Sequence, residues 1–171
     1  MHTIDLRSDT VTLPTAEMKA AISAAPLGDD VFEEDPTTIE LENLAAQKVG
    51  MEAGLLVASG TMGNLVSVLT HCGRAEEVIL GDSSHTFLYE AGGIAALGGL
   101  HPHMIPNEAD GTLDINKIES AIRTENVHFP RTRLLCLEHT PNKCGGSVLS
   151  AQYTAEVRQL AQQHGKNPTQ E

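Results

Sequence analysis

The passage with the clearest capacity for chemistry is an apolar run followed by a glycine-containing turn, GLLVA and then SGTMGN, over 54–64. If a strand leads through this turn into a helix, the first N–H groups of the helix lack intrahelical partners and carry partial positive charge. Gly60 and Gly63 let the backbone approach an anion, and three side chains can add hydrogen bonds: Ser59, Thr61 and Asn64. This pattern is that of a phosphate cradle, although it has neither P-loop nor GxGxxG spacing. An ordinary turn capped by Ser59 or Thr61 remains the alternative.

A second chemically capable segment is DSSHTFLYEAGG, over 82–93. It follows a predicted strand, so His85 is expected near the carboxyl edge of the sheet. A histidine there could stack on a planar ligand or transfer protons, whereas the alternative is a histidine in a surface loop. Tyr89 and Glu90 lie close to His85 in the sequence.

Metal and disulfide chemistry receive little support from the sequence. His101 and His103 alternate along a predicted strand and so face the same side, but no CxxC, HExxH or comparable ligand cluster accompanies them. We therefore expect no metal site. The cysteines are odd in number, and Cys72 and Cys136 lie in apolar contexts typical of small core residues.

The elements that must position these residues follow from the spacing of apolar side chains. Helices are predicted from Pro14, from Pro36 to Gly50, and over 65–69, 90–97, 114–122 and 151–164. Strands are predicted over 54–58, 78–80, 101–105 and 134–137. The acidic segment over 28–38 is expected to be solvated, with Asp35 capping the helix that follows. The alternation predicts an α/β fold with a mostly parallel sheet, whose ligands bind at the carboxyl ends of strands.

The last seven residues, GKNPTQE, interrupt this alternation. The segment is polar and contains Pro168, so we expect that it adds no buried strand and that the sheet is unfinished. The sequence thus suggests a fold over 1–164 followed by a divergent polar tail over 165–171, with the chain cut short inside its fold.

Composition and charge narrow the possible functions. The 171 residues include 11 Lys and Arg against 23 Asp and Glu, and 40% are hydrophobic, as is typical of a soluble globular protein. A net charge of −12 disfavours both nucleic acid and an anionic membrane surface as partners. No apolar run approaches the roughly 18 residues of a membrane span, and the first residues do not have the pattern of a signal peptide. A cytoplasmic location is expected.

Seven segments, taken in order, resemble the low-specificity L-threonine aldolases. They are LRSDTVTLPTAEM, GDDVFEEDPTTIELE, VASGTMGNLVS, SSHTFLYEAGG, EADGTLD, ENVHFPRTRLLCLEHTPN and GGSVLS, between Asp5 and about His164. The resemblance implies a pyridoxal-phosphate enzyme with the aspartate-aminotransferase-like fold, called fold type I. It implies a three-layer structure in which 1–164 are the first part of the cofactor-binding domain. It also implies a carbon–carbon lyase that cleaves β-hydroxy-α-amino acids, such as threonine or allo-threonine, to glycine and acetaldehyde.

The resemblance also assigns roles to individual residues. Gly60 and Thr61 match the pair that binds the cofactor phosphate, and His85 matches the histidine stacked on the ring. Two further residues match substrate contacts: Ser8 with the carboxylate and His128 with the hydroxyl. His85 and His128 are thus the catalytic candidates, and Tyr89 and Glu90 are expected to line the pocket.

Departures from the family pattern concern the covalent chemistry. In the family, the last helix leads into a strand with an aspartate that pairs the pyridine nitrogen, and a lysine further on holds the cofactor covalently; here GKNPTQE stands at that place. Among the five lysines, Lys143, in a predicted loop, is the least unsuited to replace it, and Pro141 alters the segment that reads ENTHN in the family. We therefore expect this chain alone to be inactive or nearly so.

Two other functions remain open at this stage. The family forms homo-oligomers, so the chain could be a non-catalytic isoform that assembles with a full-length subunit. A generic phosphate-binding α/β module is the third interpretation.

Overall fold

The computed structural model describes residues 4–5, 7–165 and 167–170. It separates the chain into two compact units, Met1–Leu56 and Val57–Glu171, and each is described here by itself.

The first unit is helical. It contains the short helices η1 (Asp9–Val11) and η2 (Asp30–Phe32) and the longer helices α1 (Ala16–Ala24) and α2 (Pro36–Val49). The prediction of a capped second helix is confirmed, since Asp35 Oδ1 accepts a hydrogen bond from Thr38 N at 2.8 Å. Gly50 ends this helix at φ 68°, a left-handed conformation that favours glycine.

The prediction of a buried strand over 54–58 is wrong. These residues form no strand, and Leu55 and Leu56 are 75% and 54% exposed. A strand is stable when a neighbouring strand pairs its N–H and C=O groups, and an apolar run does not supply that neighbour. Here Leu56 N instead donates to the Glu42 carboxylate, at 2.6 Å.

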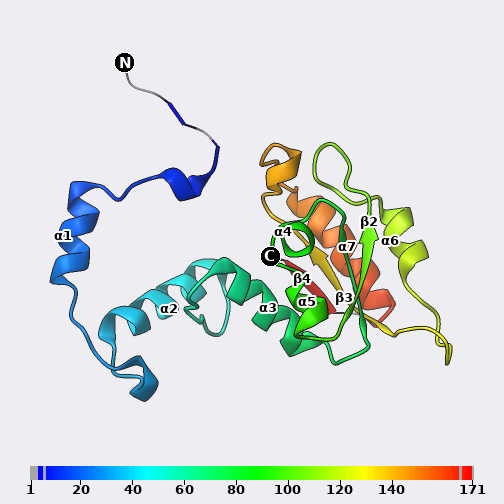
Figure 1. The fold of residues 1–171 in the computed structure, drawn as a ribbon, viewed down its shortest axis with the longest axis horizontal. Coiled ribbons are helices and arrows are strands. Elements are labelled where there is room, and N and C mark those ends of the chain that lie inside the picture. Colours follow the sequence, from blue (N-terminus) through cyan, green and yellow to red (C-terminus); the bar gives the residue numbers. More distant parts are fainter. Residues whose placement is uncertain (1–3, 6, 166, 171) are drawn as a thin grey trace. The chain divides into compact units, whose positions relative to one another are not determined.

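The second unit is built on a parallel sheet with the strand order β2-β1-β3-β4 (Figure 1). The strands are β1 (Glu77–Gly81), β2 (His101–Ile105), β3 (Thr132–Leu137) and β4 (Asn167–Gln170). The first three confirm predicted strands. β1 is buried along its whole length because it has a strand on each side and is covered on both faces.

The sequence predicts that the tail adds no buried strand and leaves the sheet unfinished, yet the tail does form a strand of the described sheet. β4 pairs in parallel with β3, with Leu135 opposite Pro168. Strand pairing uses backbone groups, so a polar segment can pair with the free edge of β3. A proline is compatible with this position because β4 is the outer strand of the described sheet.

Helices cover both faces of the sheet. Along β1, Ile79 joins a core with α6 (Ile115–Ala121) and α7 (Ala151–Gln163), whereas Val78 and Leu80 join a second core with α3 (Gly60–His71) and α5 (Gly93–Ala96). The structure therefore has the three layers that the sequence predicts. Cys72 and Cys136 are buried in the second core, as expected of small core residues, and neither forms a disulfide.

Two helices differ in length from their predictions. The segment expected as a turn over 59–64 is mostly the first turn of α3, and the segment over 90–97 is helical only in α5. The short helices α4 (His85–Leu88) and η3 (Asn142–Cys144) follow β1 and β3. No helix in the described part of the chain is long and apolar enough to cross a membrane.

Candidate functional site

Polar residues meet where β1, β2 and β3 end. Asp82 follows β1 and accepts a hydrogen bond from the backbone of Asn107, which follows β2, at 3.1 Å. Asn107 Oδ1 in turn accepts from Ser83 N at 3.0 Å. The approach is so close that a Cβ on Gly81 would overlap the Asn107 side chain. Hydrogen bonds between the segments that follow β1 and β2 therefore stabilise this carboxyl edge. Their geometry requires glycine at the end of β1.

His85 lies at this carboxyl edge, as the sequence predicts. It begins α4, and its backbone N–H donates to Glu138 Oε2 at 2.8 Å, which ties it to the end of β3. Its side chain is 48% exposed, so one part of the ring remains open to a ligand. Its Nδ1 lies 2.9 Å from Glu90 Oε1.

Glu90 is the buried centre of a network that reaches α3. Its side chain is 3% exposed, and its Oε1 accepts from Asn64 Nδ2 at 2.7 Å. The same amide nitrogen lies 3.2 Å from Thr86 Oγ1. Since Asn64 is one turn after Gly60, the network links the first turn of α3 to the His85 ring.

The first turn of α3 has the donors that an anion site needs. Ser59 caps the helix by accepting from Met62 N at 3.1 Å, and the first backbone bond joins Gly63 N to Ser59 O at 3.0 Å. The N–H groups of Gly60 and Thr61 come before that bond and so have no intrahelical acceptor. A Cβ placed on Gly60 would meet no atom within 4 Å. The turn is thus an ordinary capped helix start that leaves open space beside two donors.

Tyr89 and Lys143 lie next to His85. The Tyr89 and His85 rings are 5.5 Å apart between centroids and tilted by 51°. Lys143 Nζ lies 5.5 Å from the centre of the Tyr89 ring. A hydrogen bond with the Tyr89 side chain raises the pKa of Lys143 above its ordinary value.

Ser8 and His128, the two predicted substrate contacts, lie in other segments of the chain than His85. Ser8 belongs to the first unit, where its Oγ accepts from Thr10 N at 3.2 Å. His128 lies in the loop that enters β3, and its backbone N–H donates to Asn126 Oδ1 at 2.9 Å. Because β1 and β3 are parallel, a residue that precedes β3 and one that follows β1 lie toward opposite edges of the sheet. The roles of Ser8 and His128 stay predictions.

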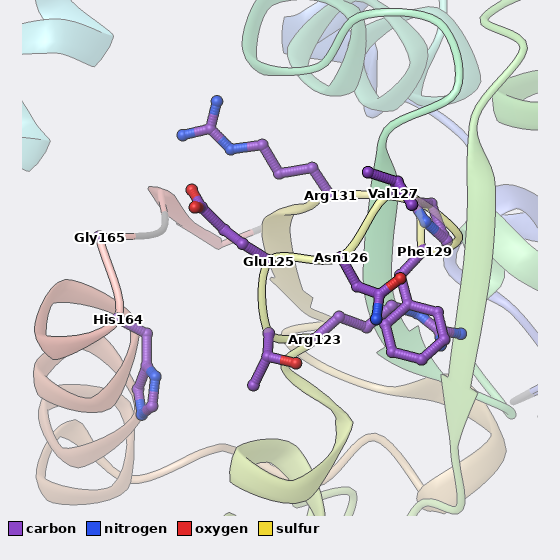
Figure 2. A pocket seen from close by; sticks show the side chains of 10 residues that line it. Arg123, Glu125, Asn126, Val127, Phe129, Arg131, His164 and Gly165 are labelled. Carbon is purple, nitrogen blue, oxygen red and sulfur yellow. The ribbon is translucent and has the colours of Figure 1, made fainter.

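A hollow of about 640 Å³ lies at the amino edge of the sheet, away from His85 (Figure 2). Its walls come from the loop before β3 and from the end of α7: Arg123, Thr124, Glu125, Asn126, Val127, Phe129, Pro130, Arg131, His164 and Gly165. Figure 2 shows Arg123 beside the Phe129 ring, and the guanidinium carbon is 5.3 Å from the ring centre.

Arg123 also pairs with Glu77, a fully buried carboxylate at the start of β1, at 2.6 Å. Burial alone would raise the pKa of Glu77, but hydrogen bonds from Arg123 and Thr132 and the nearby His103 outweigh burial and lower it. His101 and His103 approach Glu77 at 3.7 and 3.3 Å, which confirms that they share one side of β2. Within the described residues, no three potential ligands are arranged to hold a metal ion.

The sequence predicts Asn64 as a ligand to an anion, whereas its amide donates to Glu90. It does not predict Glu138, which accepts from the His85 backbone. Glu138 directly follows β3, and a carboxylate at a strand end was the signal that could have found it.

Comparisons with known proteins agree with this architecture. Residues 5–168 match the model of the Beta-eliminating lyase family. The chain is 51% identical over 168 residues to a probable low-specificity L-threonine aldolase 2 from Arabidopsis thaliana, covering 96% of this chain and 47% of that protein. It is 48% identical over 154 residues to the low specificity L-threonine aldolase of Escherichia coli K12, covering 90% and 45%. The chain thus spans about half the length of these curated relatives.

Solved structures show the same fold. A Leishmania major threonine aldolase is 25% identical, with a TM-score of 0.59 over 66% of this chain and 32% of that chain. A putative L-allo-threonine aldolase from Listeria monocytogenes is 17% identical, with a TM-score of 0.70 over 90% and 42%. The likeness extends to a PLP-dependent aminotransferase from Streptococcus suis, with a TM-score of 0.51. The described architecture corresponds to part of a fold type I pyridoxal-phosphate enzyme.

Proposed function

This chain belongs to the beta-eliminating lyase family, and from that premise we propose that it carries the phosphate-binding turn and the ring-facing histidine of a pyridoxal-phosphate site. The observation that carries the proposal is the network through Asn64 and Glu90, which joins the open first turn of α3 to His85. The whole protein would be a carbon–carbon lyase that cleaves threonine or allo-threonine to glycine and acetaldehyde.

The residues at the carboxyl edge suit two parts of this cofactor. The N–H groups of Gly60 and Thr61 would bind the phosphate, and the half-exposed ring of His85 would lie against the pyridine ring. Pyridoxal phosphate, when bound, supplies an electron sink for cleavage of a bond at the substrate Cα. The protein residues orient it and exclude water from one of its faces.

Lys143 suits a covalent role poorly. An amine attacks a carbonyl in its neutral form, and the hydrogen bond with Tyr89 raises the pKa of Lys143 and so favours the cation. We therefore propose that this chain by itself binds the cofactor without a covalent link and is inactive or nearly so.

The remaining roles are proposals of the same kind. Ser8 would contact the substrate carboxylate and His128 the substrate hydroxyl, while Tyr89 would line the pocket on the exposed side of His85. Glu90 is buried beneath His85, so a direct contact with substrate is less suited to it than support of the ring.

The test is to titrate the purified chain with pyridoxal phosphate, add borohydride and search for a lysine-linked cofactor by mass spectrometry. Saturable binding with no lysine adduct and no cleavage of threonine is expected. A stable adduct on Lys143 together with threonine cleavage would contradict the inactivity. No saturable binding at any accessible concentration would contradict the cofactor site itself.

A second candidate function is assembly with another subunit. The described side chains of the first unit expose large apolar groups, including Leu27 at 88%, Val31 at 85% and Phe32 at 71%. Exposed apolar area of this kind favours a protein partner, either a second copy or a full-length aldolase subunit. Light scattering of the purified chain should show a dimer or larger species; a monomer that also fails to co-purify with the full-length subunit would exclude it.

A further inference from the structure

The contacts of Glu90 determine which nitrogen of His85 carries the proton. An ionised carboxylate can only accept hydrogen bonds. Glu90 Oε1 already accepts from the Asn64 amide at 2.7 Å and lies 2.9 Å from His85 Nδ1. Because a carboxylate oxygen accepts both contacts, we infer that His85 donates from Nδ1.

The orientation of the Asn64 amide supports the same assignment. Its nitrogen faces two acceptors, Glu90 Oε1 and Thr86 Oγ1. A reversed amide would place its oxygen against the carboxylate, and two acceptors repel each other. Asn64 therefore acts as a fixed donor that holds the carboxylate beneath His85.

Burial makes this arrangement rigid. Glu90 is 3% exposed at its side chain and Thr86 is 1% exposed, while the His85 side chain is 48% exposed. Glu90 and Thr86 are thus shielded from water, whereas the His85 ring is partly exposed to it. His85 is held twice, by its backbone N–H on Glu138 and by Nδ1 on Glu90, which restricts the ring plane.

We propose that Asn64 and Glu90 are positioning residues, which keep His85 in the Nδ1–H tautomer and hold its ring at a fixed place relative to the first turn of α3. In the neutral ring, the Nε2 lone pair is then left to receive a hydrogen bond or a proton from a ligand. This inference rests on the proposed cofactor site for its purpose, but the tautomer is a property of the chain itself.

The experiment is long-range ¹H–¹⁵N correlation spectroscopy of the histidine rings in the whole chain, at a pH where His85 is neutral. In the unmodified protein, the Nδ1–H form of His85 should predominate. In Glu90→Gln, which keeps the shape but removes the charge, the ratio of Nδ1–H to Nε2–H should fall about tenfold, because a hydrogen bond to a charged group is replaced by one to a neutral group. Asn64→Ala should shift the ratio in the same direction by less.

The matched control is Glu156→Gln, which makes the same change on the surface of α7, where Glu156 accepts from Gln152. It should leave the His85 signals unchanged. A predominant Nε2–H form in the unmodified protein would overturn the proposal even if Glu90→Gln fails to fold. An unchanged ratio in folded Glu90→Gln would overturn it as well.

A pyridoxal phosphate titration of the same samples separates this proposal from the proposed function. Binding should weaken in Glu90→Gln and not in Glu156→Gln. If the unmodified chain shows the Nδ1–H form but does not bind the cofactor, the result supports the positioning role of Asn64 and Glu90 and contradicts the proposed cofactor site.

Discussion

At the scale of single residues, two glycines, Gly81 and Gly60, differ in how closely other atoms approach them at the carboxyl edge of the sheet. The position of a Cβ on Gly81 is already taken by the Asn107 side chain, whose Oδ1 accepts from Ser83 N. The backbone N–H of Asn107 donates to Asp82 beyond the strand. Gly60 differs, because an added Cβ there would meet no atom within 4 Å. Gly81 is thus required by close packing, whereas Gly60 is not.

Gly81→Ala should therefore destabilise the protein by about 1–3 kcal/mol, since the added methyl group would displace the Asn107 side chain. Unfolding in urea measures the loss. Gly73→Ala is the control, because an added Cβ there meets only the end of the Glu76 side chain, at 3.7 Å. Equal stability of Gly81→Ala and the unmodified protein would show that the close packing of Gly81 against Asn107 is not required.

Gly60→Asp should weaken pyridoxal phosphate binding by about tenfold or more, because a carboxylate beside the two free N–H groups repels the phosphate and competes for its donors. Ser67→Asp adds the same charge at an exposed position on α3 and should have a much smaller effect. Fluorescence titration compares the two. Equal weakening by both would mean that the phosphate does not bind at the turn.

Glu77 should give the protein an acid-sensitive component of stability. Its pKa in the folded state is lowered from an ordinary value of 4.5, so its contribution is complete above that value and is lost as pH falls through the folded pKa. Glu77→Gln breaks a buried pair with Arg123 and should cost about 3 kcal/mol at neutral pH. The difference from the unmodified protein should shrink as the pH falls below 4.5. A difference that is constant with pH, measured by urea unfolding, would contradict this.

At the scale of elements, each helix or strand depends on how its backbone groups are paired. The caps of α1, α2, α3 and α7 are all side-chain oxygens that accept a hydrogen bond from an N–H of the first turn. By contrast, the apolar run over 54–58 has no strand beside it and stays irregular, while the polar segment of β4 finds the edge of β3. Pairing partners, more than hydrophobicity, determine where strands form here.

Ser59→Ala removes the cap of α3 and should destabilise the second unit by about 1 kcal/mol. Ser67→Ala, in the middle of the same helix and exposed, should be nearly neutral or slightly stabilising. Thermal unfolding followed by circular dichroism compares the two variants. A larger loss from Ser67→Ala would show that the cap is not the important interaction.

At the scale of the whole molecule, the hydrophobic core is divided unequally. Both described cores belong to the second unit, whereas Ala46 is the one buried residue among the described side chains of the first. The stability of a helix in a protein comes mainly from packing of its apolar face. The described side chains of the first unit therefore bury little apolar surface among themselves, whereas the second unit has two hydrophobic cores of its own.

A fragment of residues 57–171 should accordingly fold with a cooperative transition, while a fragment of residues 1–56 should be mostly unfolded in dilute solution. Circular dichroism with urea titration tests both. A stable, cooperative 1–56 fragment would contradict the division, and the full chain, treated identically, is the control.

The sequence by itself determined the family, the strands β1, β2 and β3, and the location of His85 at the carboxyl edge. It could do so because helix and strand periodicities are local, and because ligand sites in parallel sheets follow from topology. Gly60, Thr61, Tyr89 and Glu90 were all named from local motifs.

Only the tertiary structure decided what those residues contact. Asn64 and Glu90 are far apart in sequence. Neither periodicity nor motif indicates that Asn64 and His85 contact the same oxygen of Glu90. The buried Glu77–Arg123 pair and the pairing of β4 with β3 are equally long-range. Such contacts depend on where separate elements meet in space, which is fixed by packing across the sheet and not by the residues that flank each partner.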